Sequence, residues 1–402
     1  MPFDVRPCRD REELSRAFYA IGQNFFGPPT DEQIDRFLGL LELERMHAAF
    51  DGDEVVGGAG AFTFELSVPG GSLRCAGVTM VGTYPTHRRR GVLSAMMRAQ
   101  LDDVHARGEP LAALWASEET IYGRYGYGLA SWVGEVSIPR EASAFAAPLE
   151  RHGQARFVSQ EEARALFPPV WEGLFAERPG VFRRTEAWWA ARRLRVPDEE
   201  KAQPRRFVAL EVDGETRAYA VYKVEPRWDA GVPVGRLEVL EAIGVNAQAT
   251  AEIWRFLLDI DWVETVRASL LPPDHPLFLL LARPRRARYR LGDGLWLRLV
   301  DVGAALSGRA YAQDGSVVLE VRDGFCPWNE GRWRLAGGVA ARTEEPAELA
   351  LDVEALGSAY LGAVSFAELQ AAFRVDELAA GAVARADAIF AWRPLPWCPE
   401  VF

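Results

Sequence analysis

Lysine is nearly absent from this chain of 402 residues. Of its 46 basic residues only Lys201 and Lys223 are lysine, which leaves 44 arginines. Such a bias is typical of codon usage in a GC-rich genome, whereas a nucleic-acid surface requires arginines clustered on a net-basic chain. The formal net charge is −11, so the sequence disfavours nucleic-acid binding and mildly favours cationic partners.

Cysteine, histidine and long apolar runs are also scarce. The four cysteines (Cys8, Cys75, Cys326 and Cys398) form no C-x-x-C pair, which indicates reduced thiols in a cytosol rather than a disulfide framework. The five histidines show no ligand spacing, so we expect no metal site. No apolar run is long enough for a transmembrane helix, and the first residues show no signal core. We therefore expect a cytoplasmic protein that does not bind a membrane.

The first part of the chain predicts an α+β module. Helical spacing begins near Glu12, and a capping box of Thr30 and Gln33 predicts a second helix that runs to Leu41. A hairpin follows the Asp51-Gly52 turn. The next expected elements are a buried strand over 73–83, a helix over 92–107 ended by Gly108, and a strand over 111–117.

The middle of the chain repeats this order. Strands are expected over 207–212, 217–224 and 237–245, followed by a helix over 247–260 and a strand over 266–271. The sequence therefore predicts a duplicated α+β module.

The last part of the chain has a different pattern. Strands are expected over 296–300, 310–313, 317–322 and 332–335, and helices over 352–361 and 366–378. The end, from Trp392 to Phe402, is rich in proline and aromatic residues, which favours an extended segment held against protein. We expect domains over 1–140, 150–290 and 291–402.

One segment carries chemistry. A buried strand ends at Thr83, three arginines (Arg88 to Arg90) and Gly91 follow, and a helix then begins. Free N–H groups at a helix N-terminus beside arginines suit a pyrophosphate. The order is neither a Walker A loop nor the dinucleotide fingerprint. A solvated basic turn before a surface helix is the alternative interpretation.

Arg88-x-x-Gly91 after a strand resembles the acetyl-CoA pyrophosphate loop of the GNAT acetyltransferase superfamily. The run from Pro85 to Gly91, the segment from Ala116 to Gly128, and the terminal Phe402 resemble one branch, the Eis (enhanced intracellular survival) family. Asp293 to Arg298 and Gly357 to Gly362 also match. One departure is Leu93, which stands where a small residue is usual.

The resemblance implies a catalytic N-terminal GNAT domain, a central GNAT-like domain without cofactor and a sterol-carrier-like domain, assembled as a homo-hexamer. The residues themselves also argue against a cofactor in the central copy, because its segment from Asn246 to Thr250 contains neither arginine nor glycine. We therefore expect coenzyme A in the first copy alone.

The resemblance also implies roles for individual residues. Tyr122 is the expected general acid, with Tyr125 and Tyr127 as rival candidates, because a phenol of pKa near 10 can protonate the departing thiolate. The terminal carboxylate of Phe402 is the expected base; it is ionised at neutral pH and would act through water or steer the ammonium. The expected acetyl-CoA contacts are Val81, Gly82, Thr83, Arg89, Arg90, Gly91, Val92, Leu93, Ser94, Ser117 and Glu118.

Members of this family acetylate aminoglycosides and lysine side chains, so a polycationic amine substrate is expected. The candidate substrate residues are Asn24, Phe25, Glu119 and Glu400. Asn24 stands where active relatives carry aspartate, and Val401 where they carry an acid, which bears on aminoglycoside efficiency. The alternatives are a protein lysine acetyltransferase and a non-catalytic lipid-binding or interaction protein; the arginine–glycine loop and Tyr122 favour catalysis.

Overall fold

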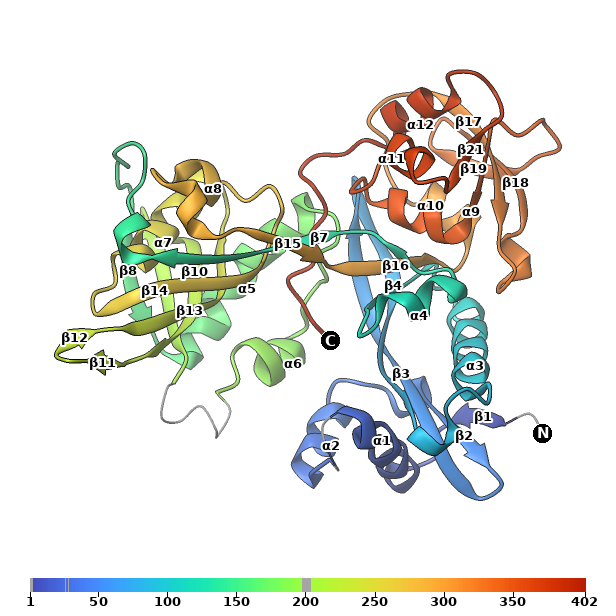
Figure 1. Ribbon diagram of the computed structural model, residues 1–402, viewed down its shortest axis with the longest axis horizontal. Helices are drawn as coiled ribbons and strands as arrows, with labels where there is room; N and C mark the ends of the chain where they lie inside the picture. Colours follow the sequence, from blue (N-terminus) through green and yellow to red (C-terminus); the bar gives the residue numbers. More distant parts are fainter. Residues whose placement is uncertain (1–2, 26, 28, 197–203) are drawn as a thin grey trace. The chain divides into compact units, whose positions relative to one another are not determined.

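The computed structural model describes residues 3–25, 27, 29–196 and 204–402 (Figure 1). Its contacts divide the chain into two compact units. Unit 1 comprises Met1–Ser131, Leu295–Pro396 and Glu400–Phe402, and unit 2 comprises Trp132–Gly294 and Trp397–Pro399. The chain therefore enters unit 2 twice, the second time for three residues near its end.

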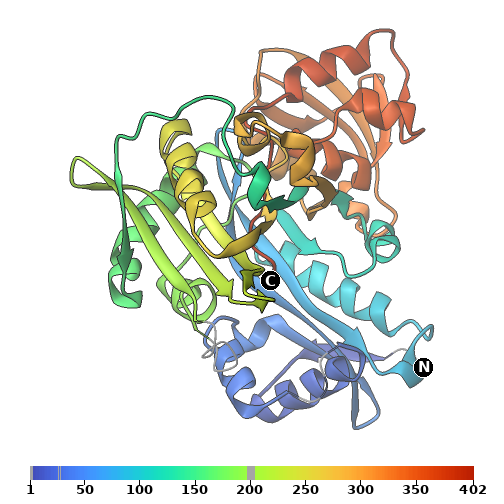
Figure 2. The same cartoon turned by 60° about the vertical axis from the view of Figure 1, so that its left-hand side comes forward.

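Unit 1 contains a seven-stranded sheet, antiparallel except where β4 and β5 run parallel. In sheet order its strands are β1 (Asp4–Pro7), β2 (Met46–Asp51), β3 (Glu54–Val68), β4 (Gly71–Thr83), β5 (Leu111–Trp115), β16 (Leu295–Leu299) and β6 (Gly128–Leu129). The helix α1 (Arg11–Phe25) precedes this sheet's hairpins, and α3 (Val92–Ala106) connects β4 to β5. Figure 2 shows α3, in cyan, along the long blue strands.

A glycine-rich stretch of β3 lets helices approach both faces of this sheet. A Cβ on Gly57 would lie 3.3 Å from the sulfur of Met96 in α3, whereas one on Gly58 would lie 3.1 Å from Ile21 in α1. Successive strand residues point to opposite faces. The small residues therefore permit close packing by α3 on one face and α1 on the other.

Unit 2 repeats the plan with a second seven-stranded sheet. In sheet order its strands are β15 (Arg290–Asp293), β7 (Trp132–Pro139), β14 (Val263–Leu271), β13 (Gly235–Gly244), β10 (Glu215–Glu225), β9 (Arg206–Val212) and β8 (Gln154–Val158). Ala218 and Ala220 of β10 join the core beneath α7 (Ala247–Asp259), while Tyr219 and Val221 join the core beneath α5 (Gln160–Glu177). The strand is buried on both faces, and the predicted α+β duplication is confirmed.

The remaining part of unit 1 is a five-stranded sheet with helices. Its strands, in sheet order, are β19 (Val339–Arg342), β18 (Gly331–Ala336), β17 (Ser316–Arg322), β20 (Leu349–Asp352) and β21 (Val375–Glu377), and its helices are α9 (Val302–Ser307), α10 (Val353–Tyr360), α11 (Phe366–Ala371) and α12 (Ala382–Phe390). Arg309, buried here, donates to the carbonyl oxygens of Tyr360 and Phe390 at the last residues of α10 and α12. Its charge thus stabilises two helix C-termini.

Shorter elements complete the chain: α2 (Asp31–Leu38), α4 (Glu119–Tyr122), α6 (Glu186–Trp188), α8 (Leu277–Leu280), β11 (Trp228–Asp229) and β12 (Val232–Pro233). The predicted capping box is present, because Thr30 accepts from the Gln33 amide and the Gln33 side chain accepts from the Thr30 amide.

Two expectations for the last part of the chain were wrong, and a third element is present but pairs outside that part. The strand expected at 310–313 is absent, because the amides of Ala310 and Ala312 donate to single carbonyls of Pro69 and Ile389 rather than to a ladder. The strand near 296–300 is present as β16, but it pairs with β5 and β6 in the first sheet. The helix expected over 366–378 ends at residue 371. Two residues later Phe373 takes a left-handed φ of 59°, and the chain then continues into β21.

Candidate active site

The parallel strands β4 and β5 form a fork in unit 1. They pair at three positions, ending with Gly77 opposite Ala113, whereas β4 continues to pair with β3 as far as Thr83. Beyond Gly77 the edge of β4 that faces β5 no longer pairs with that strand. The peptide groups on this edge are therefore placed to form hydrogen bonds with a ligand. Val81, Gly82 and Thr83, expected beside the cofactor, lie on this stretch.

The helix α3 begins directly after this stretch without a side-chain cap. Its N-cap residue, Gly91, has a φ of +91°, and no side chain accepts from the first-turn amides. The N–H groups of Val92, Leu93 and Ser94 have no partner within the helix. Because the dipole adds positive potential at this end, the first turn is a site for an anion.

The three arginines lie beside this helix end. Arg89 has a left-handed φ of 61° and an exposed side chain. Arg90 pairs with Asp51 at 3.0 Å, and about half of each side chain is exposed (48% and 45%). Such a pair is worth less than about 1 kcal/mol, so the Arg90 guanidinium can turn to a bound phosphate at little cost.

Tyr122 lies in α4, five residues after Ser117, and is 6% exposed. Burial raises the pKa of its hydroxyl, and a hydrogen bond with Ser117 opposes that rise. The phenol therefore remains protonated at neutral pH and can donate a proton. The rival Tyr125 has its hydroxyl 3.0 Å from the hydroxyl of Ser94, while the hydroxyl of Tyr127 is buried without a hydrogen-bond partner.

The chain end reaches the same fork within unit 1. The indole N–H of Trp115, at the end of β5, donates to the carbonyl oxygen of Glu400 at 2.5 Å. The Phe402 ring packs edge-on against Phe64 with centroids 5.2 Å apart. A Cβ on Gly77 would lie 3.3 Å from the Phe402 ring. The last residue thus lies over the point where β4 and β5 separate.

The candidate substrate residues are placed unevenly. The side chains of Asn24 and Phe25 lie outside the part of the chain that the structure describes. Glu118 and Glu119 are exposed at the start of α4, whereas Glu400 is 3% exposed. Of the candidate substrate residues with described side chains, Glu119 has an exposed carboxylate, and its neighbour Glu118 was expected as a cofactor contact.

Sequence reasoning missed the residues that seat the chain end: Gly77, Phe64 and Trp115. A glycine inside a buried strand marks a close approach by another group, and Gly77 between Ala76 and Val78 carried that signal. Nothing local marked Phe64 or Trp115, since their partner is about 300 residues away in the chain.

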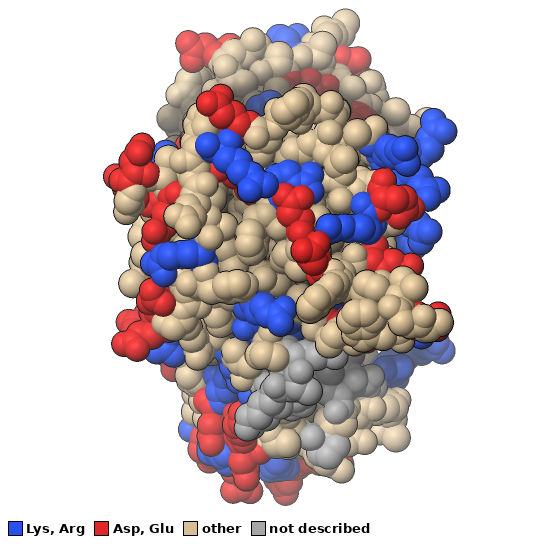
Figure 3. Space-filling model, turned by 90° about the vertical axis from the view of Figure 1, so that its left-hand side faces the viewer, with Lys and Arg blue, Asp and Glu red and all other residues tan. Residues whose placement is uncertain are grey.

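Two other kinds of feature were sought in the described part of the chain, a metal site and a membrane-spanning helix. Over residues 3–25, 27, 29–196 and 204–402, no group of three or more His, Cys, Asp or Glu side chains is arranged to hold a metal ion. None of the helices in those ranges is long and apolar enough to cross a bilayer. On the face drawn in Figure 3, acidic and basic side chains are interspersed without a continuous area of one sign.

Comparison with known proteins assigns the three parts. A family model described as an acetyltransferase (GNAT) domain matches residues 4–130, and another with the same description matches 180–299. A sterol carrier protein domain model matches residues 302–399. The GNAT fold implies the use of acetyl-CoA.

The relatives that match most or all of this chain are also N-acetyltransferases. An N-acetyltransferase of Streptomyces avermitilis is 40% identical over 418 residues, covering 100% of both chains. The N-acetyltransferase Eis of Mycobacterium tuberculosis is 37% identical over 353 residues, covering 85% of this chain and 84% of that protein. The crystal structure of Eis1 from Mycobacterium abscessus superposes with a TM-score of 0.86 at 32% identity, over 99% of this chain and 100% of that one. The chain belongs to the Eis family of GNAT-superfamily N-acetyltransferases.

Proposed function

We propose that this enzyme transfers the acetyl group of acetyl-CoA to amines of polycationic small molecules such as aminoglycosides, at one or several positions, in the cytoplasm. The observation that carries the proposal is the fork of β4 and β5. In this proposal the pyrophosphate binds at the uncapped first turn of α3, the acid Tyr122 lies just beyond β5, and the base Phe402 lies where the two strands separate.

The described residues fit acetyl-CoA. The uncapped first turn of α3, with Arg89 and Arg90 beside it, suits the pyrophosphate. The edge of β4 after Gly77 offers peptide groups to the amide-bearing arm of the cofactor. Ser117 and Glu118 follow the other strand of the fork. The thioester would then lie toward the base of the fork, where Phe402 is held.

In the proposed reaction the amine nitrogen forms a bond to the acetyl carbon, and the carbon–sulfur bond breaks. The carboxylate of Phe402 takes the proton of the ammonium group, directly or through water, so that a neutral amine can attack. Tyr122 protonates the departing thiolate, and the nitrogen, which is cationic after it attacks, gives its extra proton to the resulting tyrosinate, so that the neutral amide forms and the phenol is restored. The raised pKa of the hydroxyl keeps it protonated before the attack.

Tyr122 is preferred over its rivals for a physical reason. The Tyr125 hydroxyl lies against Ser94 in the first turn of α3, which is the proposed pyrophosphate end of the site. The Tyr127 hydroxyl is fully buried and has no partner, so it has no route for proton exchange with a ligand.

A cationic substrate is supported by charge. The formal net charge of −11 favours the approach of polycations, and Glu118 and Glu119 are exposed beside the fork. The departures at Asn24 and Val401 bear on which polycation is preferred, because both replace an acidic residue of the aminoglycoside-acetylating relatives.

The test is thiol release from acetyl-CoA with a panel of aminoglycosides, diamines and lysine-containing peptides, and mass spectrometry of the products. We expect turnover with the small polycations and a rate at least tenfold lower with the peptides. One residue appended after Phe402 moves the carboxylate and should abolish turnover while the melting temperature is kept. Preference for peptides would establish a protein acetyltransferase instead, and no turnover with any amine would refute the proposal.

A further inference from the structure

The central copy contains a fork of the same construction as the one in the N-terminal copy. Strands β13 and β14 pair in parallel from Gly235 opposite Val263 to Val239 opposite Ala268, and no further. Beyond that point β13 stays paired with β10 as far as Gly244, and β14 pairs with β7 at Leu271. As α3 follows β4, so α7 follows β13.

The helix at this second fork has a side-chain cap. Asn246 caps α7 by accepting from the amide of Ala249 at 2.8 Å, and the Thr250 hydroxyl donates to the Asn246 carbonyl. A side chain of the protein thus occupies one first-turn amide, whereas the first turn of α3 has no side-chain cap. The second fork therefore has the strand geometry of the first without its uncapped helix start.

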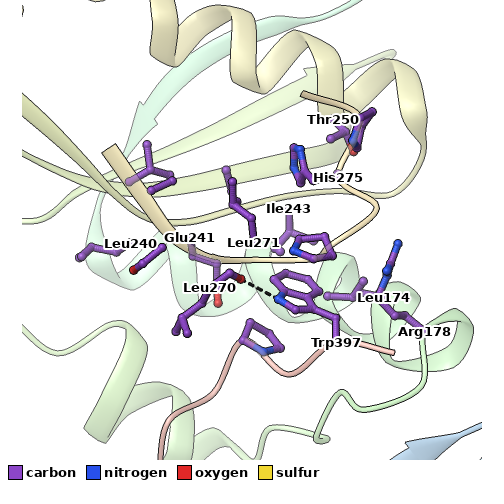
Figure 4. Close-up of a pocket in the computed structure, with 18 residues that line it drawn as sticks. Leu174, Arg178, Leu240, Glu241, Ile243, Thr250, Leu270, Leu271, His275 and Trp397 are labelled. Atoms are coloured by element: carbon purple, nitrogen blue, oxygen red, sulfur yellow. Dashed lines mark hydrogen bonds between the residues drawn. The ribbon is translucent and has the colours of Figure 1, made fainter. Parts of the chain in front are cut away.

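The second fork instead holds a residue from near the end of the chain (Figure 4). The indole of Trp397 lies among the side chains of Leu174, Ile243 and Leu271, and its N–H donates to the carbonyl oxygen of Leu270 at 2.6 Å. Trp397 is 5% exposed and belongs to the same hydrophobic core as α5. A cavity of about 120 Å³ remains beside it.

The backbone around Trp397 is held as well. Its amide donates to the carbonyl oxygen of Pro179 at 2.9 Å. A Cβ on Gly180 would lie 2.9 Å from the carbonyl oxygen of Trp397, so glycine is required for this approach. Arg193 donates to the carbonyl oxygen of Pro399 at 3.3 Å. Trp397 to Pro399 are therefore fixed to unit 2 by contacts on several sides.

The two forks bind the tail at corresponding positions. Leu270 lies two residues beyond Ala268, the last residue of β14 that pairs with β13, and Trp115 lies two residues beyond Ala113, the last residue of β5 that pairs with β4. Leu270 bonds Trp397 within unit 2, and Trp115 bonds Glu400 within unit 1. The chain passes from one set of contacts to the next between Pro399 and Glu400.

We propose that the fork of the central copy has become the anchor of the catalytic tail, and that Trp397 is the positioning residue for the carboxylate of Phe402. The inference rests on the proposed function, in which that carboxylate is the base. With Trp397 seated, three residues follow its fixed segment; without it, the extended end from 397 onward regains backbone freedom and the carboxylate is less often in place.

The test compares Trp397→Ala and Trp397→Phe with Trp228→Ala, a tryptophan of the same unit that is 58% exposed. The first readout is the rate at which carboxypeptidase releases Phe402, followed by mass spectrometry. We expect release at least tenfold faster in Trp397→Ala, an intermediate rate in Trp397→Phe, which keeps a ring and loses the bond to Leu270, and the wild-type rate in the control.

The second readout is acetyl transfer. We expect kcat of Trp397→Ala to fall about tenfold to a hundredfold with the KM for acetyl-CoA unchanged, because α3 is untouched. Added formate should restore part of that rate by replacing the misplaced carboxylate, which a loss of folded enzyme would not allow. If Trp397→Ala does not fold, Trp397→Phe carries both readouts.

Each outcome decides between the two proposals. Wild-type release of Phe402 from the Trp397 variants, or faster release with kcat unchanged, overturns the anchoring role while leaving the proposed function standing. A wild-type enzyme that transfers no acetyl group to any amine overturns the proposed function and the catalytic role of the anchor with it.

Discussion

The position of Phe402 over the fork can be tested by the substitution Gly77→Ala, which adds one methyl group under the Phe402 ring. A Cβ there would lie 2.3 Å from the Phe64 ring and 3.3 Å from the Phe402 ring. Ordinary contact begins near 3.4 Å, so the Phe64 ring must move by about 1.1 Å (3.4 − 2.3). Because that ring packs on Phe402 with centroids 5.2 Å apart, the terminal residue moves with it.

The expected effect falls on catalysis more than on folding. A misplacement of about 1 Å at a reacting group costs on the order of a hundredfold in rate, while overpacking a core costs about 1–3 kcal/mol. That destabilisation is smaller than the usual stability of a folded domain, about 5–15 kcal/mol. We therefore expect Gly77→Ala to fold and to lose about tenfold to a hundredfold in kcat.

The assay is acetyl-CoA thiol release at saturating amine, with a thermal melt of each variant. Gly71→Ala is the matched control, because Gly71 lies on the same strand and a Cβ there meets nothing within 4 Å. Phe64→Leu in the Gly77→Ala background removes the clashing ring atoms and should recover part of the rate. A folded Gly77→Ala enzyme with more than half of the wild-type kcat would refute the reasoning that places Phe402 at the base of the fork.

Three further predictions test other groups. Tyr122→Phe should lower kcat by about 10²–10⁴-fold, whereas Tyr127→Phe, which removes a buried hydroxyl without a partner, should leave kcat within twofold; equal losses in both would refute Tyr122 as the acid. Arg309→Met strips the C-termini of α10 and α12 of their donor and should cost about 3 kcal/mol in urea unfolding; an unchanged midpoint would contradict that role. Burial, together with the Arg178 charge, lowers the pKa of His275 to about 3. The unfolded chain therefore takes up a proton below about pH 6.5 that the folded chain refuses, and stability falls by about 1.4 kcal/mol per pH unit on acidification. His275→Gln should remove most of the fall in the free energy of unfolding, measured by urea titration, between pH 7.5 and 5.5. His152→Gln, at an exposed position, should keep that fall. The same dependence of stability on pH in both variants would exclude His275 as the cause.

The helices and strands that were predicted for the two copies followed from local pattern, whereas β7, β8 and α5 of the central copy were not predicted. In the C-terminal part the same reasoning failed at 310–313 and beyond 371, where single hydrogen bonds to distant carbonyls and a left-handed residue override propensity. The strand β16 was found by pattern, but its place in the first sheet was not predicted. Its alternation is the same whichever neighbour it pairs with, so only tertiary contact chooses the partner.

The arginine bias shows a similar division. We attribute the excess to codon usage, but the structure gives two of three buried arginines a use that lysine could not serve. Arg45, Arg184 and Arg298 are buried, and each bonds a buried carboxylate, those of Glu109, Glu241 and Asp323. Arg45 and Arg184 do so through two guanidinium nitrogens, a geometry that a single ammonium group cannot provide.

The sequence by itself predicted the anion site that we propose, because Arg88 to Ser94 are contiguous and a helix N-terminus acts through its own neighbouring amides. It also predicted that the central copy lacks such a site, for the same local reason. Tertiary structure alone decided three features: the fork, the packing of Phe402 over Gly77, and the hydrogen bond from Trp397 to the carbonyl oxygen of Leu270. The contacts of Phe402 and Trp397 join residues more than 100 positions apart, and the fork pairs Gly77 with Ala113, 36 positions away. A pattern of local periodicity holds no information about which distant backbone a side chain will meet.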